Sequence, residues 1–258
     1  GRYTNEFTSN CEVDMIRVGV RGSKLALAYA KRVCNELSCD TEIVIIKTAG
    51  DLNPDTPIHE IGGKGVFCNA LEQELLNGTI DVAVHSLKDM PGDVEHPNLE
   101  VCGVLERNSP HDVLIGKVFD GSRIGTSSPR RQAQVKQLFP NCEILPIRGN
   151  IDSRLKKLDN GEYDAIILAQ AGLNELGIIR EWTKLSIIPA VGQGIIAMQT
   201  IKNSKASLIV KQANHELTYR HAQLERALLK GIGGDCTTKV AAYASGSDPI
   251  KLEAEYFG

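Results

Sequence analysis

The sequence predicts an α/β protein with a small α+β addition at its C-terminal end, and three observations carry that prediction. Segments typical of strands and of helices alternate along most of the 258-residue chain, which is the pattern of parallel sheets covered by helices. A short motif recurs in the two halves, which indicates two similar lobes with a cleft between them. After residue 215 the alternation gives way to one long helix and a hairpin.

The elements of the first lobe follow from periodicity and punctuation. In order, we expect a strand at 15–20, a helix at 24–37, a strand at 42–47, a helix at 66–76 and a strand at 80–84. Ser23 precedes the first helix as its N-cap, because its hydroxyl can accept from the free N–H groups of the first turn. Residues 49–65 contain two Pro and four Gly and are too long for a tight connection, so we expect a mobile loop.

The second lobe repeats this arrangement. In order, we expect a strand at 123–125, a helix at 129–138, a strand at 143–147, a helix at 151–158 and a strand at 163–168. Pro129 follows Ser128 at the start of the first of these helices, where proline is favoured and a hydroxyl caps the helix. Both lobes therefore contain a strand-to-helix turn with a hydroxyl N-cap.

The recurring motif is a helix that ends at Asn-Gly and is followed, three residues after the glycine, by an Asp that precedes a buried strand. It contains Gly78 and Asp81 in the first half, and Gly161 and Asp164 in the second. Glycine is the favoured residue just past a helix C-terminus, so the motif is also common punctuation between a helix and a strand. Two matches in the same order favour an internal duplication.

The C-terminal part is organised differently. A helical pattern over 215–230 leads into a Gly-rich segment, and strands are expected at 239–244 and 250–256. We divide the chain into a discontinuous first lobe (residues 1–94 and 195–215), a second lobe (residues 95–194) and a shortened third domain (residues 216–258). Roughly forty residues are few for an independent core, so the third domain should lean on the lobes.

Composition excludes several classes of protein. The chain has 29 Lys+Arg against 32 Asp+Glu and is 42% apolar and 5% aromatic, which gives no reason to expect nucleic acid or a membrane as partner. Seven cysteines without a C-x-x-C spacing favour reduced thiols, and therefore a cytoplasmic protein, over a disulfide framework. We expect no metal site, because no cluster has the spacing of metal ligands. No apolar run is long enough to span a membrane.

One segment departs from the overall charge balance. Residues 121–158 contain eight Lys and Arg against two acidic residues, a local charge of +6 in a chain of −3. The arginines at its expected strand-to-helix turns are Arg130, Arg131, Arg148 and Arg154. Cations are disfavoured at a helix N-terminus unless an anion binds there as well, and guanidinium groups suit carboxylates and phosphates. We therefore expect these arginines to bind an anion in the cleft.

Two further groups could carry chemistry. Lys88 and Asp89 follow an expected strand at its carboxyl end, where ligands bind in open α/β sheets, but they could equally be an exposed pair in a turn. Cys236 follows two glycines and could act as a nucleophile or covalent anchor, or be a small buried apolar residue. The glycine-rich segment 61–65 lacks the spacing of a phosphate loop.

Several motifs together resemble one family. In order, they are VHSLKD at 84–89, GTSSPRRQ at 125–132, RGN at 148–150, LDNGEYDA at 158–165, PAVGQG at 189–194 and GGDC at 233–236. With these motifs the chain resembles hydroxymethylbilane synthase, also called porphobilinogen deaminase, from about Ile16 to Tyr243. Because several independent motifs occur in the same order, the resemblance is highly specific.

The resemblance implies three domains, of which the first two are like the lobes of a periplasmic-binding-protein fold. It implies a transferase of tetrapyrrole and heme biosynthesis that joins four porphobilinogen molecules into linear hydroxymethylbilane and releases ammonia. The implied cofactor is dipyrromethane, built from substrate and held by a thioether to Cys236. A monomer with porphobilinogen as its small-molecule partner is the corresponding expectation.

The resemblance also assigns residues. Asp89 matches the catalytic carboxylate that stabilises the positive charge left by deamination, and Lys88 stands beside it. The remaining positions, which match contacts to the carboxylates of cofactor and substrate, are Arg21, Ser23, Ser86, Lys88, Ser127, Ser128, Arg130, Arg131, Arg148 and Arg154. Each pyrrole carries acetate and propionate groups, so a growing chain accumulates the negative charge that clustered arginines can bind.

The sequence departs from the family pattern in two places. His59 and Glu60 precede the glycine-rich segment where many members carry a lysine, and only 22 residues follow Cys236 where members usually continue further. A different function remains open on the residues alone: a two-lobed module that binds a small carboxylated ligand would need the same basic cleft. Cys236 and the pairing of Lys88 with Asp89 favour the enzyme.

Overall fold

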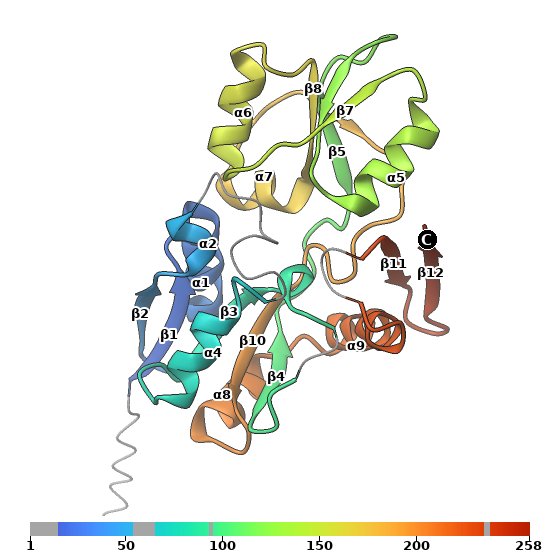
Figure 1. Cartoon of the computed structure of the whole chain (residues 1–258). Coiled ribbons are helices and arrows are strands. Elements are labelled where there is room, and N and C mark those ends of the chain that lie inside the picture. Colours follow the sequence, from blue (N-terminus) through green and yellow to red (C-terminus); the bar gives the residue numbers. More distant parts are fainter. Residues whose placement is uncertain (1–14, 54–64, 93–94, 235–237) are drawn as a thin grey trace, which may run out of the picture.

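Two separate five-stranded sheets, each flanked by helices, form two lobes, and a two-stranded hairpin lies beside them (Figure 1). The computed structural model describes residues 15–53, 65–92, 95–234 and 238–258. The expected α/β class, with a small helix-and-hairpin addition, is confirmed.

The first sheet has the strand order β2-β1-β3-β10-β4. Its strands are β1 (Ile16–Arg21), β2 (Thr41–Ile46), β3 (Val82–Ser86), β4 (Leu99–Val104) and β10 (Ile196–Ile201). The first three run parallel, whereas β10 is antiparallel to both of its neighbours. Since β4 is paired with β10, the expected boundary of the first lobe at residue 94 is wrong by one strand, and the chain leaves this sheet only after Val104.

The second sheet has the order β7-β6-β8-β5-β9. Its strands are β5 (Asp112–Gly116), β6 (Arg123–Gly125), β7 (Glu143–Leu145), β8 (Ala165–Ala169) and β9 (Thr183–Lys184). Here too three strands run parallel, and β5 is antiparallel to β8 and β9. The two sheets thus share one pairing pattern. The expectation of parallel sheets is wrong for one strand of each sheet, β10 and β5, because each lobe receives that strand from a segment that crosses between the lobes.

Helices cover both faces of each sheet because the central strands are apolar on both faces. In β3 the side chains of Val82 and Val84 join one core cluster and Ala83 joins another. In β8 the alternation is the same, with Ile166 in one cluster and Ile167 in the other. The helices of the lobes are α1 (Lys24–Glu36), α2 (Ala49–Leu52), α4 (Asn69–Leu76), α5 (Pro129–Leu138), α6 (Ile151–Asp159), α7 (Gln170–Leu176) and α8 (Lys205–Ala213).

The region expected to be a mobile loop begins with a helix. Thr48 caps the short α2, and its hydroxyl oxygen accepts from the backbone N–H of Asp51 at 3.2 Å. The expectation is therefore wrong for 49–52, because a threonine cap and a following Asp provide the local hydrogen bonds of a helical turn. The rest of the expected loop, residues 54–64, lies outside the described residues.

The C-terminal part packs on the segments that connect the lobes. It consists of α9 (Glu216–Gly231) and the antiparallel hairpin of β11 (Val240–Ser245) and β12 (Lys251–Tyr256). The Glu225 carboxylate of α9 is fully buried and accepts from both guanidinium nitrogens of Arg107, at 2.6 and 3.1 Å. It also accepts from the backbone N–H groups of Gly192 and Ala244. The C-terminal part is therefore held by contacts with the segments that connect the lobes, as expected.

Within the described ranges, none of the helices combines the length and the apolar character that a membrane crossing requires.

Candidate functional site

Lys88 and Asp89 lie in a single 3-10 turn (Leu87–Asp89) directly after β3, at the carboxyl end of a central strand. Both are half-buried. Within the described part of the chain, neither side chain forms a hydrogen bond or an ion pair. Burial, together with the positive charge of Arg131, lowers the pKa of Lys88 to about 8, while Asp89 opposes that shift. Among the described residues, the Lys88 ammonium and the Asp89 carboxylate are therefore both without a partner and available to a ligand.

Two buried arginines from the other lobe lie close enough to this turn for their charges to lower the pKa of Lys88. Arg130 and Arg131 occupy the first turn of α5, after Pro129 and the cap Ser128. Both bind the carboxylate of Asp112, with Arg130 bidentate at 2.8 and 2.9 Å and Arg131 at 2.7 Å through Nε. The two cations lower the pKa of Asp112 strongly, against the effect of its burial. The cluster of three retains one net positive charge.

Arg148 and Arg154 flank the start of α6. Arg154 donates through Nε to the carbonyl of Gly149 at 2.8 Å, and its two Nη groups have no hydrogen-bond partner among the described residues. Burial and the charges of Arg131 and Arg148 lower its pKa to about 10, and Asp89 acts in the opposite direction. Charges of both lobes therefore shift the pKa of Arg154, among them the carboxylate of Asp89 in the first lobe.

The serines assigned by sequence hold the turns together. Ser23 and Ser128 cap α1 and α5, where their hydroxyl oxygens each accept from a backbone N–H at 3.2 Å. The Ser127 hydroxyl donates to the carbonyl of Ile147 and accepts from its N–H, both at 2.9 Å, which ties the turn before α5 to the turn before α6. Ser86 is the last residue of β3 and is half-buried.

Arg21, at the end of β1, is engaged by its own lobe. Its guanidinium is 2.5 Å from the carboxylate of Asp51 and 3.9 Å from the centroid of the Phe67 ring. Burial raises the pKa of Asp51, but hydrogen bonds from Arg21 and Thr48 outweigh it and lower that pKa. Arg21 therefore lies at the same sheet edge as Lys88 but with one carboxylate already bound.

Sequence reasoning missed the acidic partners of these arginines. Asp112 lies 18 residues before Arg130, and Asp51 lies 30 residues after Arg21, so no local pattern links either pair. An Asp at the first position of a buried strand was the available signal for Asp112, because a buried carboxylate needs a cation.

Cys236 lies outside the described residues, and so do His59 and Lys64. Gly234, two residues before Cys236, has its carbonyl 3.3 Å from the backbone N–H of Gly92, three residues after Asp89. Nearby, Arg226 of α9 donates to the carbonyl of Pro91 at 3.1 Å. The C-terminal part therefore meets the first lobe directly beside the turn that carries Lys88 and Asp89.

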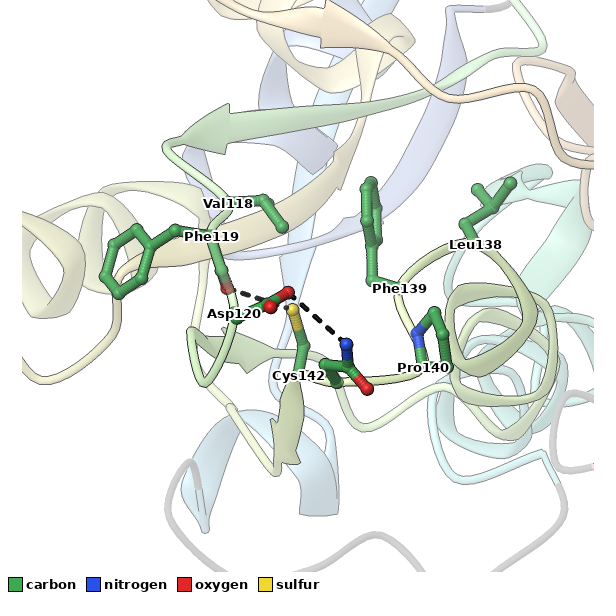
Figure 2. Close-up of a pocket in the computed structure, with 8 residues that line it drawn as sticks. Val118, Phe119, Asp120, Leu138, Phe139, Pro140 and Cys142 are labelled. Atoms are coloured by element: carbon green, nitrogen blue, oxygen red, sulfur yellow. Dashed lines mark hydrogen bonds between the residues drawn. The ribbon is translucent and has the colours of Figure 1, made fainter.

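The surface pocket in Figure 2, of about 240 Å³, is separate from this arrangement. Phe139 and Cys142 line it at the C-terminal end of α5, and Phe139 lies about 12 to 14 Å along the helix from Arg130 and Arg131. The Cys142 thiol donates to the carbonyl of Phe119 at 3.5 Å. The convergence of charged groups, and not this cavity, therefore marks the candidate site.

Comparisons with known proteins point to one family. Residues 16–208 match the family model described as porphobilinogen deaminase, dipyromethane cofactor binding domain. The chain is 42% identical over 252 residues to a probable porphobilinogen deaminase of Archaeoglobus fulgidus, covering 92% of this chain and 86% of the relative. It is 44% identical over 256 residues to one of Methanocaldococcus jannaschii, with coverage of 93% and 87%. The porphobilinogen deaminase of Rickettsia prowazekii is 39% identical over 266 residues, with coverage of 95% and 87%.

Solved structures resemble the chain more remotely. The second substrate binding domain of a putative amino acid ABC transporter from Streptococcus pneumoniae matches with a TM-score of 0.46 and 13% identity, over 85% of this chain and 94% of that one. A periplasmic substrate-binding protein of an ABC transporter from Coxiella burnetii matches with a TM-score of 0.46 and 12% identity, over 85% and 98%. Likeness at this level carries no information about chemistry.

Proposed function

The chain belongs to the porphobilinogen deaminase family, and on that premise we propose which of its residues perform the family's reaction. That reaction joins four porphobilinogen molecules into linear hydroxymethylbilane with release of ammonia, in tetrapyrrole biosynthesis, and the family's cofactor is dipyrromethane. One observation carries the assignment: Asp89 lies in the turn at the carboxyl end of the central strand β3, and no described side chain forms an ion pair with its carboxylate.

Asp89 is the catalytic carboxylate. When ammonia leaves porphobilinogen, positive charge develops on the carbon that is attacked next, and a carboxylate held in a half-buried site stabilises that charge. Asp89 suits this role because no described side chain neutralises it by a direct ion pair, so it stays available to substrate. It can also accept the proton that the new bond releases.

Lys88 and the arginines bind carboxylates of cofactor and substrate. Lys88, Arg148 and Arg154 offer donors that no described side chain occupies, and these would take the acetate and propionate groups directly. Arg130 and Arg131, with Asp112, supply one net positive charge behind them. The remaining members of the binding set are Arg21, Ser23, Ser86, Ser127 and Ser128. The Ser23 and Ser128 hydroxyls accept from the backbone and keep a proton to donate, whereas the Ser127 proton is donated to Ile147, so Ser127 positions the turn.

The donor set fits an acidic cofactor, because a dipyrromethane bears several carboxylates. The charge of Arg131 in the second lobe acts on Lys88 in the first, and the charge of Asp89 in the first lobe acts on Arg154 in the second, which supports a common site for the cations of both lobes. Cys236 is proposed as the covalent anchor, and the packing of Gly234 against Gly92 supports it, because the backbone two residues earlier lies beside the catalytic turn. When bound, the cofactor supplies the pyrrole carbon to which the first substrate is joined.

A three-domain organisation, a monomeric state and a cytoplasmic location complete the proposal. The first domain takes in β4 in addition to residues assigned from sequence, and α9 with the hairpin forms the third. Within the described residues Cys34, Cys39, Cys102 and Cys142 form no disulfide, which supports a reducing compartment. Neither nucleic acid nor a membrane is a proposed partner.

The proposed assignment is tested by assaying the purified protein with porphobilinogen for ammonia release and hydroxymethylbilane formation. The wild type should turn over, and Cys236→Ser should not. Binding of porphobilinogen without turnover by the wild type would instead favour a carboxylate-binding module. Full activity of Cys236→Ser would remove that residue as the anchor while leaving the family assignment intact.

A further inference from the structure

The lobes are joined on one side by a contact between α1 and α7. The Arg32 guanidinium of α1, in the first lobe, forms an ion pair with the Glu175 carboxylate of α7, in the second. Glu175 also accepts from the Asn108 side-chain amide at 3.0 Å, and the Asn174 side chain donates to Asn108 Oδ1 at 3.0 Å. Asn108 belongs to the segment that crosses between the lobes, so this cluster links both lobes and the crossing.

The burial of Glu175 makes its carboxylate depend on the ion pair with Arg32. The Glu175 side chain is 7% exposed, and Arg32 is the one cation within ion-pair distance of it among the residues that the structure describes. A carboxylate that is so far removed from water is costly to leave unpaired. Separation of α1 from α7 would break this ion pair, in which the Arg32 side chain is 37% exposed, so the closed arrangement has an interaction that the separated one lacks.

Beside the ion pair, α7 also approaches α1 at Gly172. Gly172, on the same helix one turn before Glu175, has no Cβ, and a Cβ built there would lie 3.6 Å from Leu25 of α1 and 2.6 Å from Ile151 of α6. Leu25 and Arg32 are seven residues apart, two turns along one face of α1. This face of α1 therefore packs against α7 over two turns.

The same face of α1 reaches the catalytic turn. Tyr29 lies between Leu25 and Arg32 on this face and packs against the core of the first lobe. Burial raises the pKa of Tyr29, and the charges of Asp89 and Glu175 raise it further. One side chain thus lies within the fields of both the interlobe ion pair and the catalytic carboxylate, so the contact and the site adjoin.

We propose that Arg32 is a positioning residue: with Glu175 it forms a latch that holds the lobes at the separation in which Asp89 faces the cations of the second lobe. This inference rests on the proposed function, because the catalytic carboxylate and the carboxylate-binding arginines come from different lobes. Opening of the latch leaves each half of the site intact but separates the halves. The fraction of molecules competent to bind substrate falls accordingly, and the apparent affinity falls by the same fraction.

The test compares Arg32→Ala and Glu175→Gln with the control Lys24→Ala. Lys24 also bridges the lobes, through Asp152 at 3.0 Å, but that pair is 79% and 50% exposed and should contribute little. For each latch variant we expect KM for porphobilinogen to rise about tenfold with kcat within about twofold, since bound carboxylates bridge the lobes again. The double variant should resemble the single ones, because both remove one interaction. Arg32→Lys should recover part of the loss.

A second readout does not depend on activity. Small-angle X-ray scattering should give a larger radius of gyration for Arg32→Ala and Glu175→Gln than for wild type and Lys24→Ala. A lower melting temperature with unchanged KM and unchanged radius of gyration would overturn the proposal and reduce the pair to a stabilising contact. If the wild type has no turnover, the proposed function fails, and the scattering comparison alone decides the latch. If Arg32→Ala does not fold, Arg32→Lys and Glu175→Gln carry the same comparison.

Discussion

The two lobes use one scaffold and differ where the scaffold ends. In each, three parallel strands are joined by an antiparallel strand that arrives from the crossing segments. At the amino ends of the sheets the match extends to single atoms. The backbone N–H of Arg17 donates to Asp81 at 2.8 Å, and that of Arg123 donates to Asp164 at 2.8 Å. The two occurrences of the recurring motif therefore form the same contact in both lobes.

At the carboxyl ends the lobes diverge. The first lobe ends β3 with Lys88 and Asp89, which no described side chain neutralises by an ion pair. In the second lobe the equivalent strand, β8, is followed by Gln170 at the start of α7, and the charged residues Arg130 and Arg131 lie instead after β6, where they bind Asp112. The repeated part of the sequence therefore builds the lobes. The residues that differ at the carboxyl edge give the first lobe a reactive half, with Lys88 and Asp89, and the second lobe a charge-binding half, with Arg130 and Arg131.

The largest expected effect comes from the reactive half. Asp89→Asn should lower kcat about a thousandfold, because the amide cannot stabilise developing positive charge or accept a proton. The melting temperature should stay near that of the wild type, since Asp89 has no side-chain hydrogen bond within the described chain. Asp89→Glu is the control, and it should retain more turnover than Asp89→Asn. Normal turnover by Asp89→Asn would remove the division of roles between the lobes.

In the charge-binding half, Asp112→Asn should act on stability first. Removal of one partner from a buried ion cluster costs about 3 kcal/mol in the free energy of unfolding, which urea titration at pH 7 measures. The pKa of Asp112 is lowered in the folded state, so its contribution is present above the unfolded pKa, near 4, and is lost as pH falls toward the folded value. The difference between wild type and variant should therefore shrink below about pH 4. An unchanged free energy at pH 7 would contradict the role of Asp112.

Much of this frame could be predicted from the sequence, and the exceptions have a common cause. The bounds of α5 agree with the expected 129–138, because Ser128 and Pro129 mark its start locally. Strand β10 was not anticipated, since it pairs with β3 across more than a hundred residues. The Arg130–Asp112 pair was missed for the same reason. Residues that start or end a helix can be recognised from the neighbouring sequence, whereas partners that the crossing segments bring together cannot.

Lys88 gives an intermediate effect with a pH signature. Its pKa, lowered to about 8 by burial and by Arg131, means that the ammonium loses its proton as pH rises from 7 to 9. If this charge binds a substrate carboxylate, kcat/KM should fall about tenfold over that interval. Lys88→Arg stays charged and should flatten this limb of the profile. The same alkaline decline in Lys88→Arg as in wild type would assign the titration to another group.

The smallest effect is expected where the lobes agree. Arg17→Ala and Arg123→Ala each remove a surface ion pair, with side chains 40% and 41% exposed, and should shift the melting temperature by less than about 4 °C without changing kcat. The two shifts should be similar because the pairs are equivalent. A loss of turnover in one variant alone would show that the amino ends of the sheets are not functionally alike.

Intact-protein mass spectrometry reports directly on whether one covalently anchored, growing chain is held between the two lobes. The mass of the active wild type should exceed that of the polypeptide by two pyrrole units, and porphobilinogen should add further single-pyrrole steps. Cys236→Ser should show the polypeptide mass alone. A wild type that turns over porphobilinogen at the bare polypeptide mass, before and during reaction, would contradict the account.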